Sequence, residues 1–317
     1  MSGPRRASTA PPPAQQASPA AAEHDAAFRS GFVAIVGRPS VGKSTLLNAL
    51  VGARISITSR KPQTTRHRIA GIVTDPQVQF VFVDTPGFQT RHRSTLNDRL
   101  NRTVRESLAD VDVVVWVVDA ARVTAADEAV AALLPAGTPL VIAVNKVDAL
   151  DHKRELLPRL AALAALKPDA AIVPISAERG TQLAELKAEI ARHLPLSPPL
   201  YAADELTDRD ERFLAAELVR EKIFRQLGDE VPYATTVVIE RFEQEGALRR
   251  INAAVLVDRA SQRAILIGDK GARMKAIATQ ARLDMESLFG GPVFLEVWVR
   301  VKKGWADDER SLARLGY

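Results

Sequence analysis

Short apolar runs alternate with helical patterns between residues 28 and 194. The runs are rich in β-branched side chains, and we expect strands at residues 32–36, 68–73, 78–83, 113–118, 140–144 and 171–175. Between them, apolar residues recur at helical spacing, as at Leu183, Leu186, Ile190 and Leu194. This alternation predicts an α/β domain that has a mostly parallel sheet with helices on both faces.

Residues 195–206 interrupt the periodicity. Pro195, Pro198 and Pro199 fall in this segment, and proline favours turns and loops over the interiors of helices and strands. We therefore expect a linker at 195–206, with one domain before it at 28–194 and a second domain after it at 207–317.

The second domain has a different pattern. It is expected to begin with a helix whose apolar positions are Phe213, Leu214, Leu218, Ile223, Phe224 and Leu227. Alternating apolar and polar residues then predict half-buried strands at 235–242, 251–257 and 293–301, with a basic helix after Gly271. Because strands and helices no longer alternate one by one, the pattern indicates an α+β domain.

Composition narrows the class of protein. Residues 1–27 are mainly Ala, Pro, Ser and Gln, which cannot bury enough apolar surface to order the chain, so we expect a disordered tail. The chain has no cysteine, which excludes disulfides and thiolate metal sites, and the cytoplasm is the expected location. No apolar run approaches the roughly 18 residues of a membrane span. A net charge of +5 is compatible with a nucleic-acid partner without requiring one.

The first chemical motif is a P-loop. Residues 37–44 read Gly-Arg-Pro-Ser-Val-Gly-Lys-Ser and lie between an expected strand and an expected helix. In this context the backbone N–H groups surround phosphate oxygens, Lys43 supplies a positive charge and Ser44 offers a hydroxyl to Mg2+. The sequence therefore predicts nucleotide contacts from Gly37, Arg38, Pro39, Ser40, Val41, Gly42, Lys43, Ser44 and Thr45.

Three further motifs follow expected strands, at the sheet edge where α/β proteins bind ligands. Residues 84–87 read Asp-Thr-Pro-Gly; Asp84 can hold Mg2+ through a water and Gly87 can offer its N–H to the γ-phosphate. Residues 145–148 read Asn-Lys-Val-Asp; the Asp148 carboxylate can accept two hydrogen bonds from guanine, which adenine cannot match. Asn145 would tie this loop to the P-loop, and Lys146 would cover the base. The third motif, which completes the base pocket, is Ser176, Ala177 and Glu178.

Together these motifs resemble those of translation-factor-class GTPases, from residue 31 to about residue 194. Residues 61–68 read Lys-Pro-Gln-Thr-Thr-Arg-His-Arg and resemble the first switch of the Era family of bacterial GTPases, and the second domain is similar to a type II KH domain. The resemblance implies that Thr65 binds Mg2+ in the GTP state, with Thr64 as second choice, and that Lys43, Thr65 and Gly87 serve hydrolysis. GTP is then expected to order residues 62–67 and 84–93.

Two positions depart from related GTPases. A Gln often follows the Asp-x-x-Gly motif and orients the attacking water, but here that residue is Phe88, so slow intrinsic hydrolysis is expected. Relatives that use K+ carry an Asn in the P-loop where this chain has Ser40, which puts stimulation by K+ in doubt.

The KH resemblance centres on a Gly-x-x-Gly loop, where glycine lets the backbone approach RNA phosphates. It implies RNA contacts from Gly268, Asp269, Lys270, Gly271, Arg273 and Lys275, and we add Lys302, Lys303 and Trp305, with Trp305 as a stacking residue. Trp298 is expected in the core. The family implies the 3′ end of small-subunit ribosomal RNA as ligand, a role in assembly of the 30S subunit, a monomeric state and peripheral association with the inner membrane.

Two other classes of function stay open at this point. A P-loop ATPase or small-molecule kinase would share residues 37–44, although the motif at 145–148 argues against it. A non-enzymatic RNA adaptor would keep both domains but use bound nucleotide only as a scaffold.

Overall fold

The computed structural model describes residues 28–59, 61, 64–88, 95–228, 231–305 and 308–314. The tail expected at 1–27 lies outside the described residues. So do Pro62, Gln63 and residues 89–93 of the segments that GTP is expected to order.

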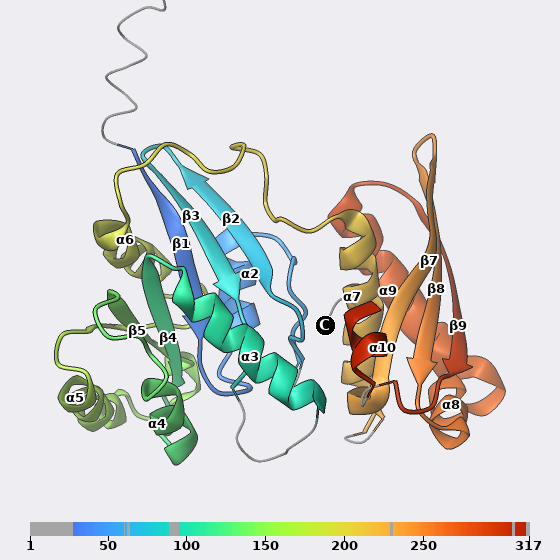
Figure 1. Ribbon diagram of the computed structural model, residues 1–317, viewed down its shortest axis with the longest axis horizontal. Coiled ribbons are helices and arrows are strands. Elements are labelled where there is room, and N and C mark those ends of the chain that lie inside the picture. The colour runs from blue at the N-terminus through green and yellow to red at the C-terminus, as the bar shows by residue number, and fades with distance from the viewer. Residues whose placement is uncertain are drawn as a thin grey trace, which may run out of the picture.

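The first domain is built on a six-stranded sheet of order β2-β3-β1-β4-β5-β6 (Figure 1). Its strands are β1 (Arg29–Val36), β2 (Ile69–Asp75), β3 (Val78–Asp84), β4 (Val113–Asp119), β5 (Leu140–Asn145) and β6 (Ala171–Pro174). All neighbours pair in parallel except β2 and β3, which are antiparallel. The predicted, mostly parallel sheet is confirmed, and each expected strand lies within a few residues of its predicted position.

Helices cover both faces of this sheet, as predicted. They are α2 (Lys43–Val51), α3 (Thr95–Ala109), α4 (Ala125–Ala131), α5 (Leu156–Leu166) and α6 (Leu183–His193). Successive strand residues point to opposite faces, so Val33 and Ile35 pack with α2 and α6, whereas Ala34 and Val36 pack with α3, α4 and α5. This double burial explains why the strands read as continuous apolar runs.

Residues 195–206 connect the domains, and they run along the first domain rather than through open solvent. Leu196 bridges to Arg29, and the Gln79 Oε1 atom accepts hydrogen bonds from the N–H groups of Leu200 and Tyr201, at 2.7 and 2.9 Å. In Figure 1 this connection passes over the top of the molecule before it reaches the second domain. The domain boundaries at 194 and 207 stay predictions.

The second domain contains a three-stranded sheet of order β7-β8-β9, antiparallel between β7 and β8 and parallel between β8 and β9. Its elements are α7 (Glu211–Gln226), β7 (Thr235–Glu245), β8 (Leu248–Val257), α8 (Ala260–Ile267), α9 (Ala272–Phe289), β9 (Val293–Val301) and α10 (Glu309–Arg314). Helices α7 and α9 cover one face of the sheet, where Ile251, Ala253 and Val255 face the core. The expected α+β domain is confirmed.

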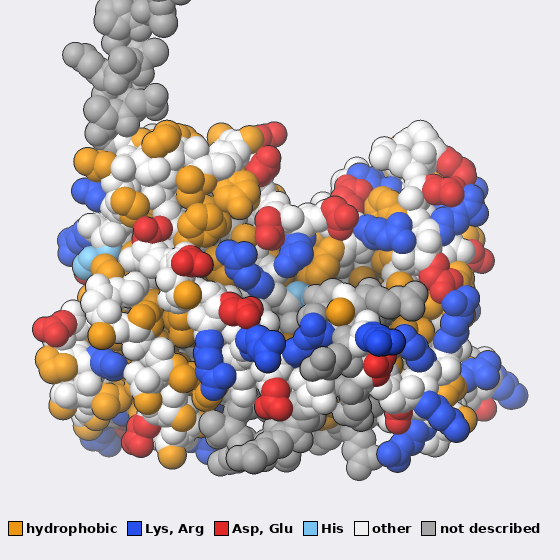
Figure 2. Space-filling model, in the orientation of Figure 1, with side chains coloured by type: hydrophobic (Ala, Val, Ile, Leu, Met, Phe, Trp, Pro, Cys, Tyr) orange, Lys and Arg blue, Asp and Glu red, His pale blue; other side chains and the backbone are white. Residues whose placement is uncertain are grey.

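The two domains meet along α7. Figure 1 places this helix between the first domain and the sheet of the second domain, and Figure 2 shows a notch between the domains at the top of the same view. The apolar face of α7 packs into the core of the second domain through Leu218, Val219 and Ile223. Its charged residues Glu217, Arg220 and Glu221 are also buried, because their face of the helix lies against Thr58 and Thr64 of the first domain.

None of the described helices combines the length and the apolar composition that a membrane span requires.

Candidate functional site

The P-loop joins β1 to α2 at the carboxyl edge of the sheet, as predicted. Gly42 precedes the helix with φ +99°, and a Cβ at this position would lie 2.4 Å from Asn145 Nδ2, so only glycine fits both the backbone and the neighbour. The Lys43 Nζ atom donates to the carbonyl oxygens of Gly37 and Arg38, both at 3.1 Å. Burial lowers the pKa of this ammonium group to about 8. The loop thus presents one buried amine and the start of a helix to a phosphate.

Three residues proposed for Mg2+ converge beside the P-loop. The Ser44 hydroxyl lies 2.7 Å from Thr65 Oγ1 and donates to Asp84 Oδ2 at 2.7 Å. Burial raises the pKa of the Asp84 carboxyl, an effect that Lys43 and the neighbouring hydroxyls oppose. Asp84 Oδ1 is buried and accepts no hydrogen bond from the described residues. Two hydroxyls and a carboxylate with a spare buried oxygen fit a hard divalent cation and its bound water.

The remaining motif residues at this edge agree with their expected positions. Thr85 donates to the carbonyl oxygen of Ile35 at 2.9 Å, which ties the loop of Asp84 to β1, and Gly87 packs against Pro39 of the P-loop. Phe88 is buried in the hydrophobic cluster beneath α3. Its side chain therefore serves the core and has no group that could move a proton.

The base loops lie together on the other side of the P-loop. Asn145 Nδ2 donates to the Val41 carbonyl oxygen at 2.9 Å, and its Oδ1 accepts from the N–H groups of Lys146 and Ala177. Lys146 Nζ donates to the Ser40 carbonyl oxygen at 2.7 Å, which lays its alkyl stem along the P-loop. The Asp148 carboxylate lies 3.7 Å from the Arg179 guanidinium. Ser176 is buried, while Glu178 is exposed.

The Gly-x-x-Gly loop connects α8 to α9. Gly268, Lys270 and Gly271 all have positive φ, and Asp269, Lys270, Arg273 and Lys275 are exposed. A groove beside the loop is lined by residues of α8, α9 and β9, including Arg263, Met274, Lys275 and Trp298. Exposed cations next to a concave apolar surface suit a single-stranded nucleic acid.

Trp305 is corrected by the structure. We predicted it as a stacking residue beside Lys302 and Lys303, but its side chain is completely buried with Leu96, Leu100 and Leu312, between α3 and α10. Lys302 is half-buried and Lys303 exposed. Trp298, which we expected in the core, is instead half-buried in the groove, and the Arg300 guanidinium lies 5.6 Å from its ring centre. Leu295, Val297 and Val299 of β9 face the core, so Trp298 lies on the opposite face of the strand, which the helices do not cover.

Sequence reasoning missed the contacts between the switch segment (residues 61–68) and α7. Arg220 donates to the Thr64 carbonyl oxygen, and Arg66 is buried against the second domain. The only available signal was the set of charged residues on α7, which a solvent-exposed face would explain equally well.

Comparison with known proteins agrees with the nucleotide-binding fold of the first domain and the KH fold of the second. Residues 32–146 match the family described as 50S ribosome-binding GTPase, and residues 230–306 match the KH domain family. The protein named GTPase Era from Nitrosomonas eutropha is 56% identical over 290 residues, covering 92% of this chain and 98% of the relative. The one from Chromobacterium violaceum is also 56% identical, over 292 residues, covering 92% of this chain and 99% of the relative.

Two solved Era structures share the whole architecture. One is a variant from Aquifex aeolicus bound to GDP and aluminium fluoride, and the other holds MgGDPNP and nucleotides 1506–1542 of 16S ribosomal RNA. Each superposes with a TM-score of 0.88 at 36% identity, covering 92% of this chain and 99% of the other.

Proposed function

This chain belongs to the Era family of GTPases, and we propose that it hydrolyses GTP at the site formed by the P-loop, Thr65, Asp84 and Gly87 while its KH domain holds small-subunit ribosomal RNA. The observation that carries the assignment is the convergence of Ser44, Thr65 and Asp84, because their oxygens come within hydrogen-bond distance of one another at the start of α2.

The residues divide the work of hydrolysis. The P-loop N–H groups and Lys43 hold the β- and γ-phosphates and offset the charge that develops on them. Ser44, Thr65 and the buried Asp84 carboxylate would hold Mg2+, which neutralises phosphate charge when bound. The Gly87 N–H fixes the γ-phosphate. The attacking water is oriented without help from the side chain at position 88, which is Phe88. Hydrolysis is therefore slow until another group assists it.

Specificity for guanine rests on the second set of loops. Asp148 accepts from the N1–H and the 2-amino group, Ala177 and its neighbours offer backbone N–H groups, and the Lys146 stem covers the ring. Hydrolysis assays with GTP in the presence of excess ATP test this against the ATPase alternative. Loss of GTP turnover in excess ATP would contradict the assignment.

The KH domain supplies the RNA site. We propose that the Gly-x-x-Gly loop clamps the backbone near the 3′ end of small-subunit ribosomal RNA, as the complex of the related protein with 16S nucleotides supports. Lys and Arg side chains gather on both domains across the face in Figure 2, which suits a polyanion. Two measurements distinguish a GTP-dependent switch from a non-enzymatic RNA adaptor. The first is binding of a labelled 3′-end oligonucleotide, and the second is single-turnover GTP hydrolysis with and without that oligonucleotide.

We further propose a weaker preference for K+ over Na+ than that of the relatives that carry Asn at the position of Ser40. Ser40 has φ +63°, a left-handed conformation that Asn adopts more readily than most residues, so Ser40→Asn should fit the loop and increase the preference. Hydrolysis in matched KCl and NaCl measures both proteins, and strong K+ dependence of the unmodified protein would refute the proposal. A role in assembly of the 30S subunit and peripheral association with the inner membrane are also proposals from family membership.

A further inference from the structure

Thr65 is flanked on both sides by residues that hydrogen-bond across the domain interface. Arg220 Nη2, from α7 of the KH domain, donates to the Thr64 carbonyl oxygen at 2.5 Å. Arg66 donates in the opposite direction, to the carbonyl oxygens of Thr235, Pro232 and Tyr233, at 2.9, 3.1 and 2.9 Å. The backbone that carries the Thr65 hydroxyl is therefore held at both ends by the RNA-binding domain.

Both arginines are buried, and Arg220 is paired with a carboxylate of its own helix. Arg66 is 2% exposed and Arg220 is 1% exposed. Glu217, one turn earlier on α7, accepts from Arg220 Nε at 2.7 Å and from its Nη2 at 2.6 Å. Burial alone would raise the pKa of the Glu217 carboxyl, but the charge and hydrogen bonds of Arg220 outweigh burial and hold this pKa below its usual range. Both residues of the pair belong to α7, so Glu217 does not itself join the domains; it orients the Arg220 guanidinium group toward the Thr64 carbonyl oxygen.

An aromatic side chain supports both guanidinium groups. Phe224 is fully buried, and its ring centre lies 5.6 Å from the Arg66 Cζ atom and 5.3 Å from the Arg220 Cζ atom. Cation–π contacts of this kind strengthen when water is excluded. The two arginines, from different domains, thus share one aromatic partner.

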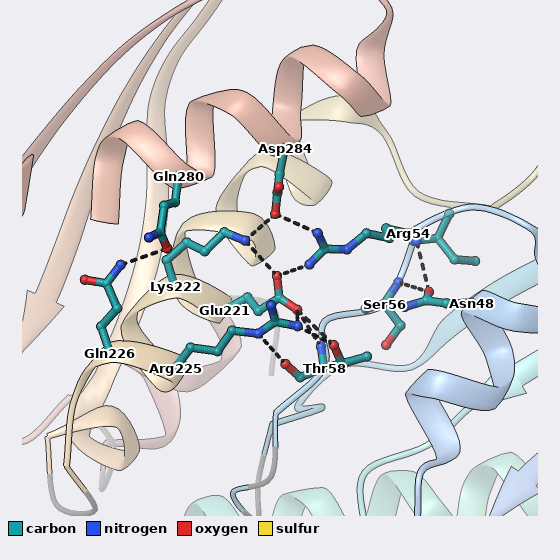
Figure 3. A network of polar contacts seen from close by, with 11 residues as sticks. Asn48, Arg54, Ser56, Thr58, Glu221, Lys222, Arg225, Gln226, Gln280 and Asp284 are labelled. Carbon is teal, nitrogen blue, oxygen red and sulfur yellow. Dashed lines mark hydrogen bonds and ion pairs between the residues drawn. The ribbon is translucent and has the colours of Figure 1, made fainter. Parts of the chain in front are cut away.

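A second connection reaches the Mg2+ site through residues 54–58 (Figure 3). Glu221 of α7 is fully buried and accepts from the N–H of Thr58 at 2.9 Å and from its hydroxyl at 3.1 Å. Arg54 joins Glu221 to Asp284 of α9, at 2.5 and 2.8 Å. On the same loop, the Ser56 hydroxyl donates to Asp84 Oδ2 at 2.9 Å. Both Thr65 and Asp84 are therefore linked to α7 through a few hydrogen bonds.

We propose that α7 of the KH domain is a working part of the GTPase site, with Arg220 as the positioning residue that holds the Thr65 hydroxyl at the metal position through the Thr64 carbonyl. This inference rests on the assignment of Thr65 in the proposed function. It follows that movement of the KH domain that separates Arg220 from Thr64 lowers the affinity of the GTP complex for Mg2+. By linkage, the metal and nucleotide that fix Thr65 favour the docked position of α7 by the same factor.

The test compares full-length variants across a Mg2+ titration with two readouts, single-turnover GTP hydrolysis and equilibrium binding of a non-hydrolysable GTP analogue. Glu217→Gln combined with Arg220→Met removes both members of the buried pair together, so neither loses its partner and folding is better preserved than with either single change. We expect hydrolysis at low Mg2+ to fall about tenfold or more, with partial recovery at high Mg2+, because a mispositioned ligand weakens the metal rather than the chemistry. Affinity for GDP should change little. Arg220→Lys keeps the positive charge but not the planar guanidinium geometry, so its Mg2+ profile should lie between those of the unmodified protein and the double variant.

Arg212→Met is the matched control. Arg212 is also an arginine of α7 that donates to backbone carbonyls, but its acceptors, Ile239 and Glu240, lie within the KH domain. We expect an unchanged Mg2+ profile for this variant. If the double variant is folded by circular dichroism and keeps the Mg2+ midpoint and rate of the unmodified protein, the inference is overturned.

Thr65→Ala separates failure of this inference from failure of the site assignment. If Thr65→Ala also leaves the Mg2+ profile unchanged, the assignment of Thr65 is wrong. If Thr65→Ala is impaired while the double variant is normal, only the role of Arg220 is wrong.

Discussion

Asn145 Nδ2 donates a hydrogen bond to the carbonyl oxygen of Val41, so the loop that selects the base is fastened to the loop that holds the phosphates. The same amide accepts from the N–H groups of Lys146 and Ala177. One buried side chain therefore sets the spacing of three loops that are far apart in the sequence.

Asn145→Ala should lower both stability and GTP affinity. It leaves a buried carbonyl and two N–H groups without their partner, at about 1–3 kcal/mol each before relaxation and entry of water. We expect the free energy of unfolding to fall by about 2–4 kcal/mol, measured by chemical denaturation. Stability within a few tenths of a kcal/mol of the unmodified protein would show that water replaces the amide.

Asp148→Asn should exchange the preferred base. The substitution leaves guanine donors without an acceptor, and losing one side of such a pair costs about 2–5 kcal/mol. Binding of GTP should weaken severely, while xanthosine nucleotides should bind, because their base offers a carbonyl where guanine offers an amine. Titration with both nucleotides measures this, and GTP affinity within a few-fold of the original would refute the role of Asp148.

The sequence predicted the nucleotide site better than the RNA site for a physical reason. Asp84 ends β3 and Ser44 lies just after β1, and these two strands are parallel neighbours. The carboxyl ends of parallel neighbours share an edge of the sheet, so local sequence patterns predict that the two residues lie close together. Trp305 has no such constraint. Its basic neighbours suggested a surface position, but Leu96 and Leu100, from the other domain, cover it. Likewise, nothing near Arg220 in the sequence shows that it faces Thr64, because the packing of the domains determines that contact.

Gly271→Asp should weaken RNA binding by an order of magnitude or more and leave GTP affinity nearly unchanged. Gly271 has φ +80°, and a Cβ there would meet no atom within 4 Å, so the change adds charge and modest backbone strain without a clash. The negative charge would oppose the approach of an RNA phosphate. Binding is measured with the 3′-end oligonucleotide.

Gly290→Asp is its matched control. Gly290 caps the other end of α9 with φ +68° and equally open space, so it has the same strain and charge away from the loop. Equal loss of RNA affinity in both variants would favour a general effect of charge or folding. Normal RNA affinity in a folded Gly271→Asp protein would show that the Gly-x-x-Gly loop is not part of the RNA site.

Trp305→Ala should destabilise the protein without removing an RNA contact. Truncating a fully buried tryptophan costs about 3–5 kcal/mol, and this side chain packs against α3 of the GTPase domain. Thermal unfolding should show a lower midpoint, whereas RNA affinity measured well below that midpoint should hold. A folded variant with unchanged stability and weaker RNA binding would instead support a role for Trp305 in stacking on RNA.

The hydrogen bonds of Arg66 to KH carbonyls limit how freely these domains can be recombined. Its partners are backbone atoms, so their chemical groups are present in any KH sequence, but their positions depend on how residues 232–235 enter β7. A KH domain grafted from a distant protein would have to reproduce that backbone path and also carry an acidic–basic pair equivalent to Glu217 and Arg220. An exchange of residues 207–314 would therefore have to preserve their contacts with Thr58, Thr64 and Arg66 and also the packing of Trp305 against Leu96 and Leu100 of α3.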